Sequence, residues 1–315
     1  MRTLLRALAG LALVALLLVG LLAAYDRRAP RPAPWMQALH LQPRYAAVDG
    51  HRLRYLRAGR GPAVVLVHGF ASSLYTWKDV IPGLAVDHQV VALDLPGFGL
   101  SDRPPDLSVE DLPRAVVGVM DALGVSRAAL VGNSMGGAAV ALVAAKQPER
   151  CSAVVLIDAA GFDMDPRDQP TFVRIALSPT GALLARLPAK RVLVELVLRQ
   201  VLHDPKLVTD ERVAEYLRDA RRPGSFATVR SLGASLRGHY GVVQAALGRV
   251  KAPTLVVWGK EDAWIPLGDA ARFAAAIAGA RQAVIADAGH LPQEERPQEL
   301  LLLLRDFLHQ AESRP

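Results

Sequence analysis

The stretch GNSMG at residues 132–136 decides how this chain of 315 residues is expected to fold. Residues 127–131 before it (RAALV) form a short apolar run that is typical of a buried strand. Residues 137–146 after it (GAAVALVAAK) have the composition of a helix. Because the two glycines carry no Cβ atom, they permit a tight turn. We therefore expect Ser134 to project from a sharp turn between a strand and a helix, at the carboxyl end of a sheet.

Further apolar runs predict an α/β fold built on a mainly parallel, eight-stranded sheet. Six buried strands are expected at residues 63–67, 89–93, 127–131, 153–157, 254–258 and 282–285. Residues 45–48 and 53–56 flank Asp49-Gly50, which is typical of a hairpin turn and predicts an antiparallel edge. Helices are expected at residues 76–84, 108–123, 267–278 and 297–311. This alternation predicts a sheet that helices cover on both faces.

Residues 161–247 interrupt the alternation. They contain no convincing strand pattern, and helical spacing is found at residues 192–198, 212–217 and 226–236. We interpret them as a helical cap inserted into a core formed by residues 44–160 and 248–315. The apolar side chains of the cap could line an acyl-binding pocket or pack the cap onto the core, and the sequence leaves both uses open.

The amino-terminal segment is a separate element. Residues 7–24 are eighteen consecutive apolar residues or glycines. As a helix they would extend about 27 Å, close to the roughly 30 Å thickness of a bilayer core. A cleaved signal peptide is the alternative, but its apolar region is usually shorter, and the best cleavage site, after Ala24, has a leucine where a small residue is preferred. We therefore predict that residues 1–24 form a transmembrane anchor.

The flanks of this segment bear on its orientation. Two arginines precede it and three follow it, so the preference of positive charge for the cytoplasmic side does not decide the orientation. A short basic amino end is typical of an exporting segment, and we expect the rest of the chain outside the cytoplasm, periplasmic or extracellular. The proline-rich residues 25–43 are expected to be a linker.

Composition limits the classes of partner. Hydrophobic residues make up 51% of the chain and charged residues 21%, so the chain can bury a sizeable core. A net charge of +7 could attract anionic lipid or nucleic acid. No nucleic-acid-binding motif or dense Lys/Arg run occurs, so we expect no nucleic-acid partner. Cys151 is the only cysteine, which excludes an intrachain disulfide.

A serine at such a turn becomes a nucleophile only with a base beside it and an acid that orients the base. Of the eight histidines, His290 follows the last predicted strand, which places it at the same edge of the sheet as Ser134. Asp262 follows the preceding strand, so its carboxylate could accept a hydrogen bond from the His290 ring and fix its tautomer. Glu261 and Asp158 are the competing acids.

The oxyanion that forms when a carbonyl is attacked needs preorganised N–H donors. We predict the amide of Met135, at the start of the helix after Ser134, and the amide of Phe70, in the loop that begins at His68. We expect His68 to brace this loop rather than to act as a second base. The chemistry needs no cofactor, and the sequence shows no metal-ligand spacing and no nucleotide-binding fingerprint.

Together these features resemble the α/β-hydrolase family over roughly residues 44–312. The shared elements are His68-Gly69-Phe70 with Trp77, the loop 94–102, the Ser134 turn, Trp258-Gly-x-x-Asp262 and Gly289-His290. They occur in the family's order of serine, aspartate and histidine. The resemblance implies Ser134 as nucleophile, His290 as base and Asp262 as acid, and a mainly structural role for the loop 94–102.

Departures from related patterns narrow the class. Haloalkane dehalogenases and epoxide hydrolases of this fold have aspartate where this chain has Ser134. Carbon–carbon bond hydrolases of ring-fission products often share the stretch GNSMGG found at residues 132–137, but their oxyanion loop usually continues with Gly-Pro instead of Ala71-Ser72. Cofactor-free haloperoxidases and perhydrolases share the His-Gly-Phe loop. Membrane-anchored monoacylglycerol-lipase-like enzymes share the Ser-Met-Gly turn and an amino-terminal anchor, and this resemblance fits best.

Three hypotheses of function result. The first is hydrolysis of carboxylic esters, of lipid-derived or small acyl groups, through an acyl-enzyme at Ser134. The second is hydrolysis of carbon–carbon bonds in ring-fission products, for which Arg174, Arg191 or Arg230 could bind a substrate carboxylate; perhydrolase-like or thioesterase chemistry is a further alternative. The third is a non-catalytic, anchored binding protein. We favour the first because the triad, the anchor and the apolar cap occur together.

Overall fold

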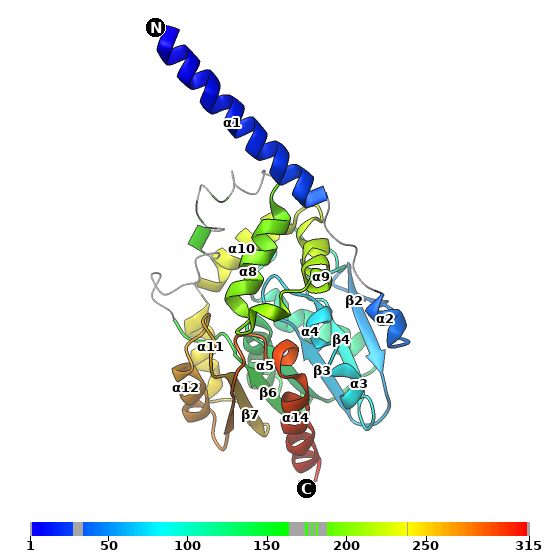
Figure 1. Cartoon of the computed structure of the whole chain (residues 1–315). Coiled ribbons are helices and arrows are strands. Elements are labelled where there is room, and N and C mark those ends of the chain that lie inside the picture. Colours follow the sequence, from blue (N-terminus) through cyan, green and yellow to red (C-terminus); the bar gives the residue numbers. More distant parts are fainter. Residues whose placement is uncertain are drawn as a thin grey trace.

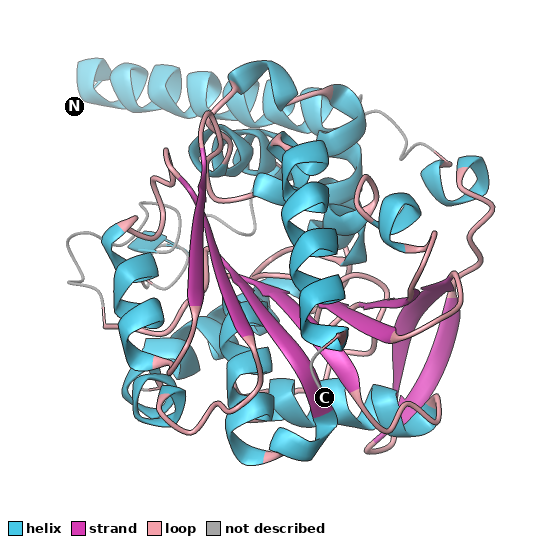
Figure 2. Ribbon diagram, turned by 90° about the horizontal axis from the view of Figure 1, so that it is seen from below, coloured by secondary structure: helices cyan, strands magenta, loops and turns pink. Residues whose placement is uncertain are grey.

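The computed structural model has an α/β architecture in which one sheet is covered by helices on both faces (Figures 1 and 2). The residues that the structure describes are 2–27, 34–163, 174–175, 178, 181, 188–237 and 239–313. The predicted fold class is confirmed, and so is the eight-stranded, mainly parallel sheet.

The sheet has the strand order β1-β2-β4-β3-β5-β6-β7-β8. The strands are β1 (Arg44–Val48), β2 (His51–Ala58), β3 (Ala63–Val67), β4 (Gln89–Leu93), β5 (Ala128–Asn133), β6 (Cys151–Ile157), β7 (Thr254–Gly259) and β8 (Arg281–Ile285). β2 pairs antiparallel with β1 and with β4, and the remaining pairs are parallel. The predicted hairpin at the antiparallel edge is confirmed.

Helices connect the strands and form the cap. The helices are α1 (Arg2–Arg27), α2 (Trp35–Ala38), α3 (Ile81–Leu84), α4 (Asp111–Ala122), α5 (Met135–Lys146), α8 (Lys190–Val201), α9 (Asp210–Ala220), α10 (Ser225–Arg237), α11 (Tyr240–Leu247), α12 (Gly268–Ala276), α13 (Pro292–Glu295) and α14 (Pro297–Glu312). Short 3-10 turns occur at η1 (Leu74–Trp77), η2 (Pro148–Arg150) and η3 (Pro205–Leu207).

The helix predicted at residues 76–84 was wrong. The structure instead has η1 and then the separate single turn α3. Pro82 is in the first turn of α3. A proline has no N–H for a helical hydrogen bond to a preceding turn but is tolerated where a helix begins, so the helix restarts here.

Successive side chains of the central strands enter two different cores. Val65 and Leu130 belong to the cluster that includes α4 and α5, whereas Val64 and Val131 belong to the cluster that includes α3 and α14. This is the alternation that a strand imposes. Because both faces are covered by helices, the carboxyl ends of the parallel strands are left to carry the loops of a functional site.

The cap helices α8, α9 and α10 lie above the sheet in Figure 1. They contain the helical stretches predicted at residues 192–198, 212–217 and 226–236. Parts of the predicted cap, at residues 164–173, 176–177, 179–180 and 182–187, lie outside the described residues.

The helix α1 projects away from the core, and among the described residues its contacts with the cap are at its carboxyl-terminal end (Figure 1). Tyr25 OH donates to Glu195 Oε1 at 2.9 Å, and the Arg191 amide donates to Asp26 Oδ1 at 2.9 Å. Asp26 also pairs with Arg221 at 2.9 Å. Tyr25 and Asp26, predicted to begin a linker, are therefore part of a helix that is bonded to α8 and to the carboxyl-terminal end of α9.

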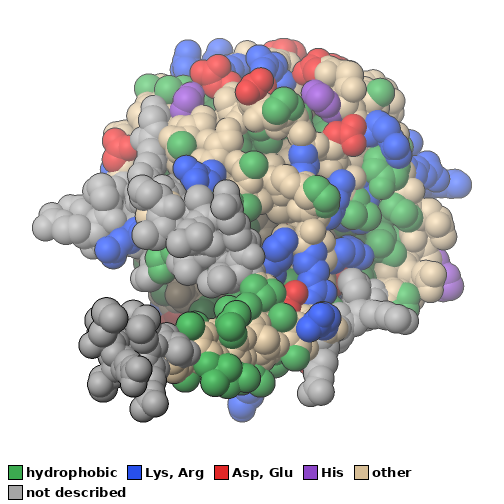
Figure 3. All heavy atoms as spheres, turned by 90° about the horizontal axis from the view of Figure 1, so that it is seen from above, with side chains coloured by type: hydrophobic (Ala, Val, Ile, Leu, Met, Phe, Trp, Pro, Cys, Tyr) green, Lys and Arg blue, Asp and Glu red, His purple; other side chains and the backbone are tan. Residues whose placement is uncertain are grey.

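The exposed part of α1 is apolar. Its window Gly10–Arg27 has a mean hydropathy of 1.8, and none of that window is buried. The helix is long and apolar enough to cross a bilayer, and a signal sequence would have the same properties. Figure 3 looks onto this end of the molecule and shows apolar side chains along α1, with Lys and Arg side chains beside it.

Candidate active site

Ser134 lies in the turn between β5 and α5, with φ 55° and ψ −121°. The turn is possible because of the glycines on either side. A Cβ atom on Gly132 would lie 2.3 Å from the carbonyl oxygen of Gly136, and one on Gly136 would lie 2.3 Å from the carbonyl oxygen of Val67. Since such contacts cannot be accommodated, side chains are excluded at both positions. The sharp turn predicted from the sequence is present.

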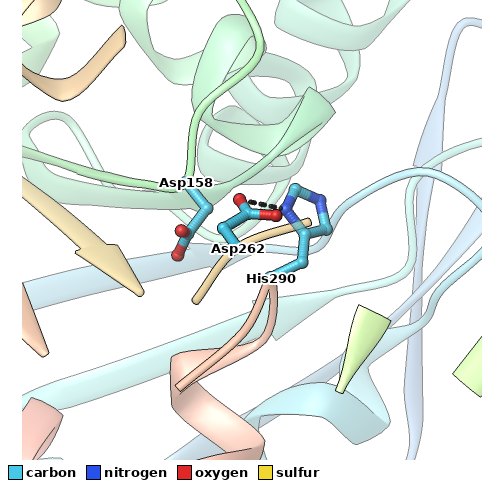
Figure 4. Close-up of side chains that lie close together, drawn as sticks. All are labelled: Asp158, Asp262 and His290. Carbon is cyan, nitrogen blue, oxygen red and sulfur yellow. Dashed lines mark hydrogen bonds and ion pairs between the residues drawn. The ribbon is translucent and has the colours of Figure 1, made fainter. Parts of the chain in front are cut away.

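His290 and Asp262 meet as predicted. His290 Nδ1 lies 2.8 Å from Asp262 Oδ2, and both side chains are buried (Figure 4). Asp262 Oδ1 accepts from the amides of Trp264 at 2.7 Å and Ile265 at 3.1 Å, which fixes the carboxylate. The contact with Asp262 assigns the ring proton to Nδ1 and leaves Nε2 as the proton acceptor. The ring of Trp264 lies 5.5 Å from that of His290, measured between centroids.

Asn133 brings the Ser134 turn and the histidine loop together. Its Nδ2 donates to the carbonyl of His290 at 3.1 Å and to that of Ile157 at 3.2 Å. Within the described residues the Ser134 hydroxyl and His290 are not hydrogen-bonded to each other, which is common for catalytic groups without substrate. The residue before Ser134 thus holds the loop that carries His290 against the turn.

Asp262 is the one of the three candidate acids that bonds the imidazole. Glu261 Oε2 instead accepts from the Ala288 amide at 3.2 Å. Asp158 Oδ1 accepts from the Gly259 amide at 2.9 Å. One potential ligand atom from each of Asp158, Asp262 and His290 lies within 4.8 Å of the others. Asp262 accepts three hydrogen bonds, so both of its oxygens already have protein donors.

The His68 side chain forms hydrogen bonds that fix the predicted oxyanion loop. His68 is fully buried, and its Nε2 accepts from the Leu95 amide at 2.9 Å. Its Nδ1 therefore carries the proton and donates to the Gly69 carbonyl at 2.7 Å. Burial lowers the pKa of His68, which favours this neutral form. The bracing role predicted for His68 agrees with these bonds.

Phe70 and Met135 occupy the positions expected of the two oxyanion donors. Met135 is the first residue of α5, where backbone amides have no partner within the helix. Phe70 packs edge-on against Phe98, with 5.9 Å between ring centroids. In the described part of the chain neither amide donates to a protein acceptor, so both are free for a substrate oxygen.

Glu295 is a site residue that sequence reasoning missed. Its two carboxylate oxygens accept from the amides of Gly289 at 2.7 Å, His203 at 2.7 Å and Asp204 at 3.2 Å. The His290 amide also donates to the carbonyl of Val201 at 2.8 Å. The end of α8 is thereby bonded to the histidine loop. Glu295 follows a run of acidic and amide side chains in the sequence, and nothing there indicates a partner ninety residues away.

A second buried network, also missed, joins the cap helix α9 to the core. Tyr216 OH donates to Glu294 Oε1 at 2.5 Å, and the Thr76 hydroxyl donates to the same oxygen at 2.7 Å. Arg212 Nε lies 2.7 Å from Glu294 Oε2. Desolvation and the negative charge of Glu294 raise the pKa of Tyr216 well above its ordinary value, so the phenol remains a donor.

A mainly apolar cavity of about 420 Å³ lies between the cap helices and the core. Its apolar lining comes chiefly from α8, α9 and α10 and includes Leu193, Val194, Val197, Leu198, Tyr216 and Phe226. On the core side it is lined by Ala71, which follows Phe70, and by Phe98. The cavity therefore ends beside the oxyanion loop, and Ser134 itself is outside its lining.

The cationic side chains at this cavity are mostly engaged. Arg222 donates to the carbonyls of Gly99 and Ser101, and Arg221 is paired with Asp26. Lys190 also lines the cavity. Among the described lining residues there is none of the three arginines suggested for a substrate carboxylate, Arg174, Arg191 and Arg230.

Comparison with known proteins agrees with this arrangement. The chain matches the family model for the alpha/beta hydrolase fold over residues 62–297. It is 31% identical over 267 residues to the uncharacterized hydrolase YugF of Bacillus subtilis (strain 168), covering 83% of this chain and 96% of that protein. It is also 31% identical over 276 residues to a 2-hydroxy-6-oxo-6-phenylhexa-2,4-dienoate hydrolase of Comamonas testosteroni, covering 82% and 91%.

One solved structure is similar over the full length of both chains. It is the crystal structure of a membrane phospholipase A, described as a bacterial virulence factor, with a TM-score of 0.76, 27% identity and 100% coverage of each chain. The chain therefore belongs to the α/β-hydrolase family, and both relatives compared above are named as hydrolases.

Proposed function

We propose that this protein is a membrane-anchored serine hydrolase that cleaves the acyl ester bond of lipid-derived substrates. One observation carries the proposal. The helix α8 holds the carboxyl-terminal end of α1 through Arg191 and Glu195, and the same helix lines the apolar cavity that ends beside Phe70. An acyl chain that leaves a bilayer next to α1 would find an apolar site of suitable volume leading toward Ser134.

The proposed reaction has two stages. Ser134 Oγ attacks the acyl carbonyl while His290 Nε2 accepts its proton, and Asp262 stabilises the imidazolium that results. The amides of Phe70 and Met135 bind the oxyanion. His290 then protonates the leaving alcohol, and the acyl group remains on Ser134. In the second stage His290 removes a proton from water, which attacks the acyl-enzyme and releases the acid.

The full-length similarity to a membrane phospholipase A supports the lipid substrate, because it includes the segment that contains α1. The test uses the full chain in detergent or vesicles. We expect turnover of p-nitrophenyl esters and of phospholipid or monoacylglycerol substrates, with a preference for medium or long acyl chains. Absence of ester turnover in protein that still reacts with a fluorophosphonate probe would argue for another substrate class.

Substitutions on α8 can test whether the cavity binds the acyl chain. Val197→Trp places an indole in the cavity lining, whereas Leu196→Trp changes a neighbouring side chain that is 53% exposed. We expect Val197→Trp to raise KM for long-chain esters about tenfold, a loss typical of steric overpacking, with little change for acetate esters. Leu196→Trp should leave both unchanged. Equal effects of the two variants would contradict the assignment of this cavity to the acyl chain.

We further propose that α1 is the anchor and that the core, residues 44–160 and 248–315, lies outside the cytoplasm together with the cap, residues 161–247. The apolar window Gly10–Arg27 supports the anchor. In a bacterial host, the protein should stay in the membrane fraction after alkaline extraction and become protease-sensitive when the outer face of the inner membrane is exposed. Release as a shortened soluble chain would identify a signal peptide instead.

Carbon–carbon bond hydrolysis is the second candidate. The relatives named as dienoate and semialdehyde hydrolases support it more directly than they support an esterase, and the stretch GNSMGG at residues 132–137 agrees with them. The cavity gives it limited support, because none of Arg174, Arg191 and Arg230 is in the described lining, and Lys190 is the one lining cation there without a partner and so available for a substrate carboxylate.

A ring-fission dienoate distinguishes the two candidates. Such a compound absorbs visible light and loses the absorbance when it is cleaved. Rapid loss of colour that requires Ser134, together with weak ester turnover, would favour the second candidate. Strong ester turnover with no loss of colour would favour the first.

A further inference from the structure

A second carboxyl group lies beside the proposed acid–base pair, and the reaction above does not use it. Asp158 directly follows β6 and is fully buried. Its Oδ1 accepts from the Gly259 amide at 2.9 Å, and its Oδ2 has no hydrogen-bond partner in the described part of the chain. In Figure 4, Asp262 lies between Asp158 and His290.

The surroundings of the two carboxyl groups differ in a way that places the negative charge on Asp262. Asp262 accepts hydrogen bonds from two amides and from His290, and each of these favours an ionised carboxylate. Asp158 accepts one bond, and no Lys or Arg among the described residues pairs with it. The titratable groups near Asp158 are Glu295 on α13, Asp262 on the loop after β7 and His290 on the loop after β8.

On balance, the interactions of Asp158 favour its un-ionised form. Burial first, and then the negative charge of Asp262, raise the pKa of Asp158 well above its ordinary value, and contact with the Asp262 side chain and the charge of Glu295 add to the rise. The hydrogen bond from the Gly259 amide opposes this rise without reversing it. An un-ionised carboxyl with Oδ1 as acceptor would carry its proton on Oδ2, the oxygen without a partner.

The backbone conformation of Asp158 is also unusual. Asp158 has φ 43°, in the left-handed region, and its amide donates to the Val257 carbonyl at 3.0 Å. Non-glycine residues are uncommon there, and Asp and Asn are the side chains that tolerate it best. Strained conformations of this kind persist where the surrounding structure requires them, which is often at functional sites.

We propose that Asp158 is a positioning residue that stays un-ionised beside Asp262, so that a single negative charge faces His290. The inference rests on the proposed function, because it takes His290 to be the base. A second negative charge within 4.8 Å would stabilise the imidazolium. His290 would then be held in the form that cannot accept the proton of Ser134.

The pH dependence of fluorophosphonate labelling tests this. Asp158→Asn keeps the shape and neutrality of the side chain and tolerates the left-handed backbone. We expect its labelling rate to be within about threefold of wild type, and the pH midpoint of labelling to be unchanged. If Asp158 were ionised in the wild type, removing its charge would move the midpoint to lower pH by about one unit or more, and that shift would overturn the proposal.

A third variant separates positioning from bulk structure. Asp158→Ala removes both the group that faces Asp262 and the acceptor of the Gly259 amide. We expect it to label about tenfold more slowly than wild type, with the rate restored by Asp158→Asn at the same position. Labelling of Asp158→Ala at the wild-type rate would mean that Asp158 does not position the acid, and the proposal would fail.

Infrared spectroscopy tests the proton directly and does not depend on activity. Wild-type protein with ¹³C-labelled aspartate should show an isotope-shifted carboxylic-acid C=O band at about pH 8, well above the ordinary aspartate range. Burial raises the pKa of Asp219 to about 6, so that group is largely ionised at this pH. Buried Glu215 and Glu295 do not carry the label. The band should be missing from Asp158→Asn.

The infrared band and the fluorophosphonate labelling distinguish failure of this inference from failure of the proposed function. Absence of the aspartate band in wild type would overturn the inference even if Asp158→Asn did not fold. Absence of fluorophosphonate labelling in wild type would overturn the proposed function, while the band would still report the protonation of Asp158.

Discussion

Ser134→Ala is expected to lower ester turnover by at least about 10⁴-fold, as removal of a nucleophile from such a triad does elsewhere. The variant should also lose all fluorophosphonate labelling. The physical reason is that the acyl-enzyme needs an oxygen at this turn, and the neighbouring Asn133 and Met135 have no hydroxyl to supply it. Turnover should be measured with a p-nitrophenyl ester and with the lipid substrate that the wild type prefers.

The loss should come without a loss of folding. Ser134 contributes its backbone to the fold, since its carbonyl accepts from Ala138 and Ala160 and its amide donates to Ile157. Alanine retains these bonds and faces the same φ of 55°. Ser126→Ala, at an exposed position before β5, is the matched control and should behave as wild type. Wild-type turnover in Ser134→Ala with an unchanged melting temperature would refute the proposed mechanism.

Asp262→Asn is expected to lower turnover by about 10⁴-fold, the effect that a wrong histidine tautomer has in a comparable triad. The oxygen of the new amide should stay on Oδ1, because the amides of Trp264 and Ile265 donate there. The amide NH₂ would then face His290 Nδ1. That nitrogen must become an acceptor, which moves the ring proton to Nε2 and leaves no acceptor for the proton of Ser134.

Glu261→Gln is the control for this prediction, because Glu261 is the adjacent acid in the sequence and, among the described residues, its carboxylate accepts from the Ala288 amide and not from His290. We expect Glu261→Gln to keep most of the activity. The profile of turnover against pH, recorded for both variants, should show a uniform loss in Asp262→Asn. A larger loss of turnover in Glu261→Gln than in Asp262→Asn would show that Asp262 is not the acid that orients His290.

The features that sequence predicted well are those that depend on local pattern. Short apolar runs predicted six of the strands, since a strand covered on both faces must be apolar along its length, and the Asp49-Gly50 turn predicted the antiparallel pair at the edge. Ser134, Asp262 and His290 were each predicted by their place after a strand, because parallel strands bring those positions to one edge. The pairing of His290 with Asp262 follows from that topology.

What the sequence did not predict depends on contacts between distant segments. Glu295 bonds the amides of Gly289, His203 and Asp204, and an acidic side chain on a short helix gives no local sign of such partners. The anchor was predicted to end at residue 24, three residues before α1 ends, for a related reason. The α1 residues Tyr25 and Asp26 are polar and read as a linker, but partners on the cap hold them in the helix.

The geometry of α8 restricts how this protein can change. One end of the helix is bonded to Asp26 of α1. At the other end the carbonyl of Val201, its last residue, accepts from the His290 amide, and the amides of His203 and Asp204 just beyond it donate to Glu295. Inserting or deleting one residue in a helix turns everything beyond it by about 100° and moves it about 1.5 Å. Such a change would break one set of bonds or the other. We therefore expect insertions and deletions to be tolerated in the loops around α8 and to be excluded from the helix itself.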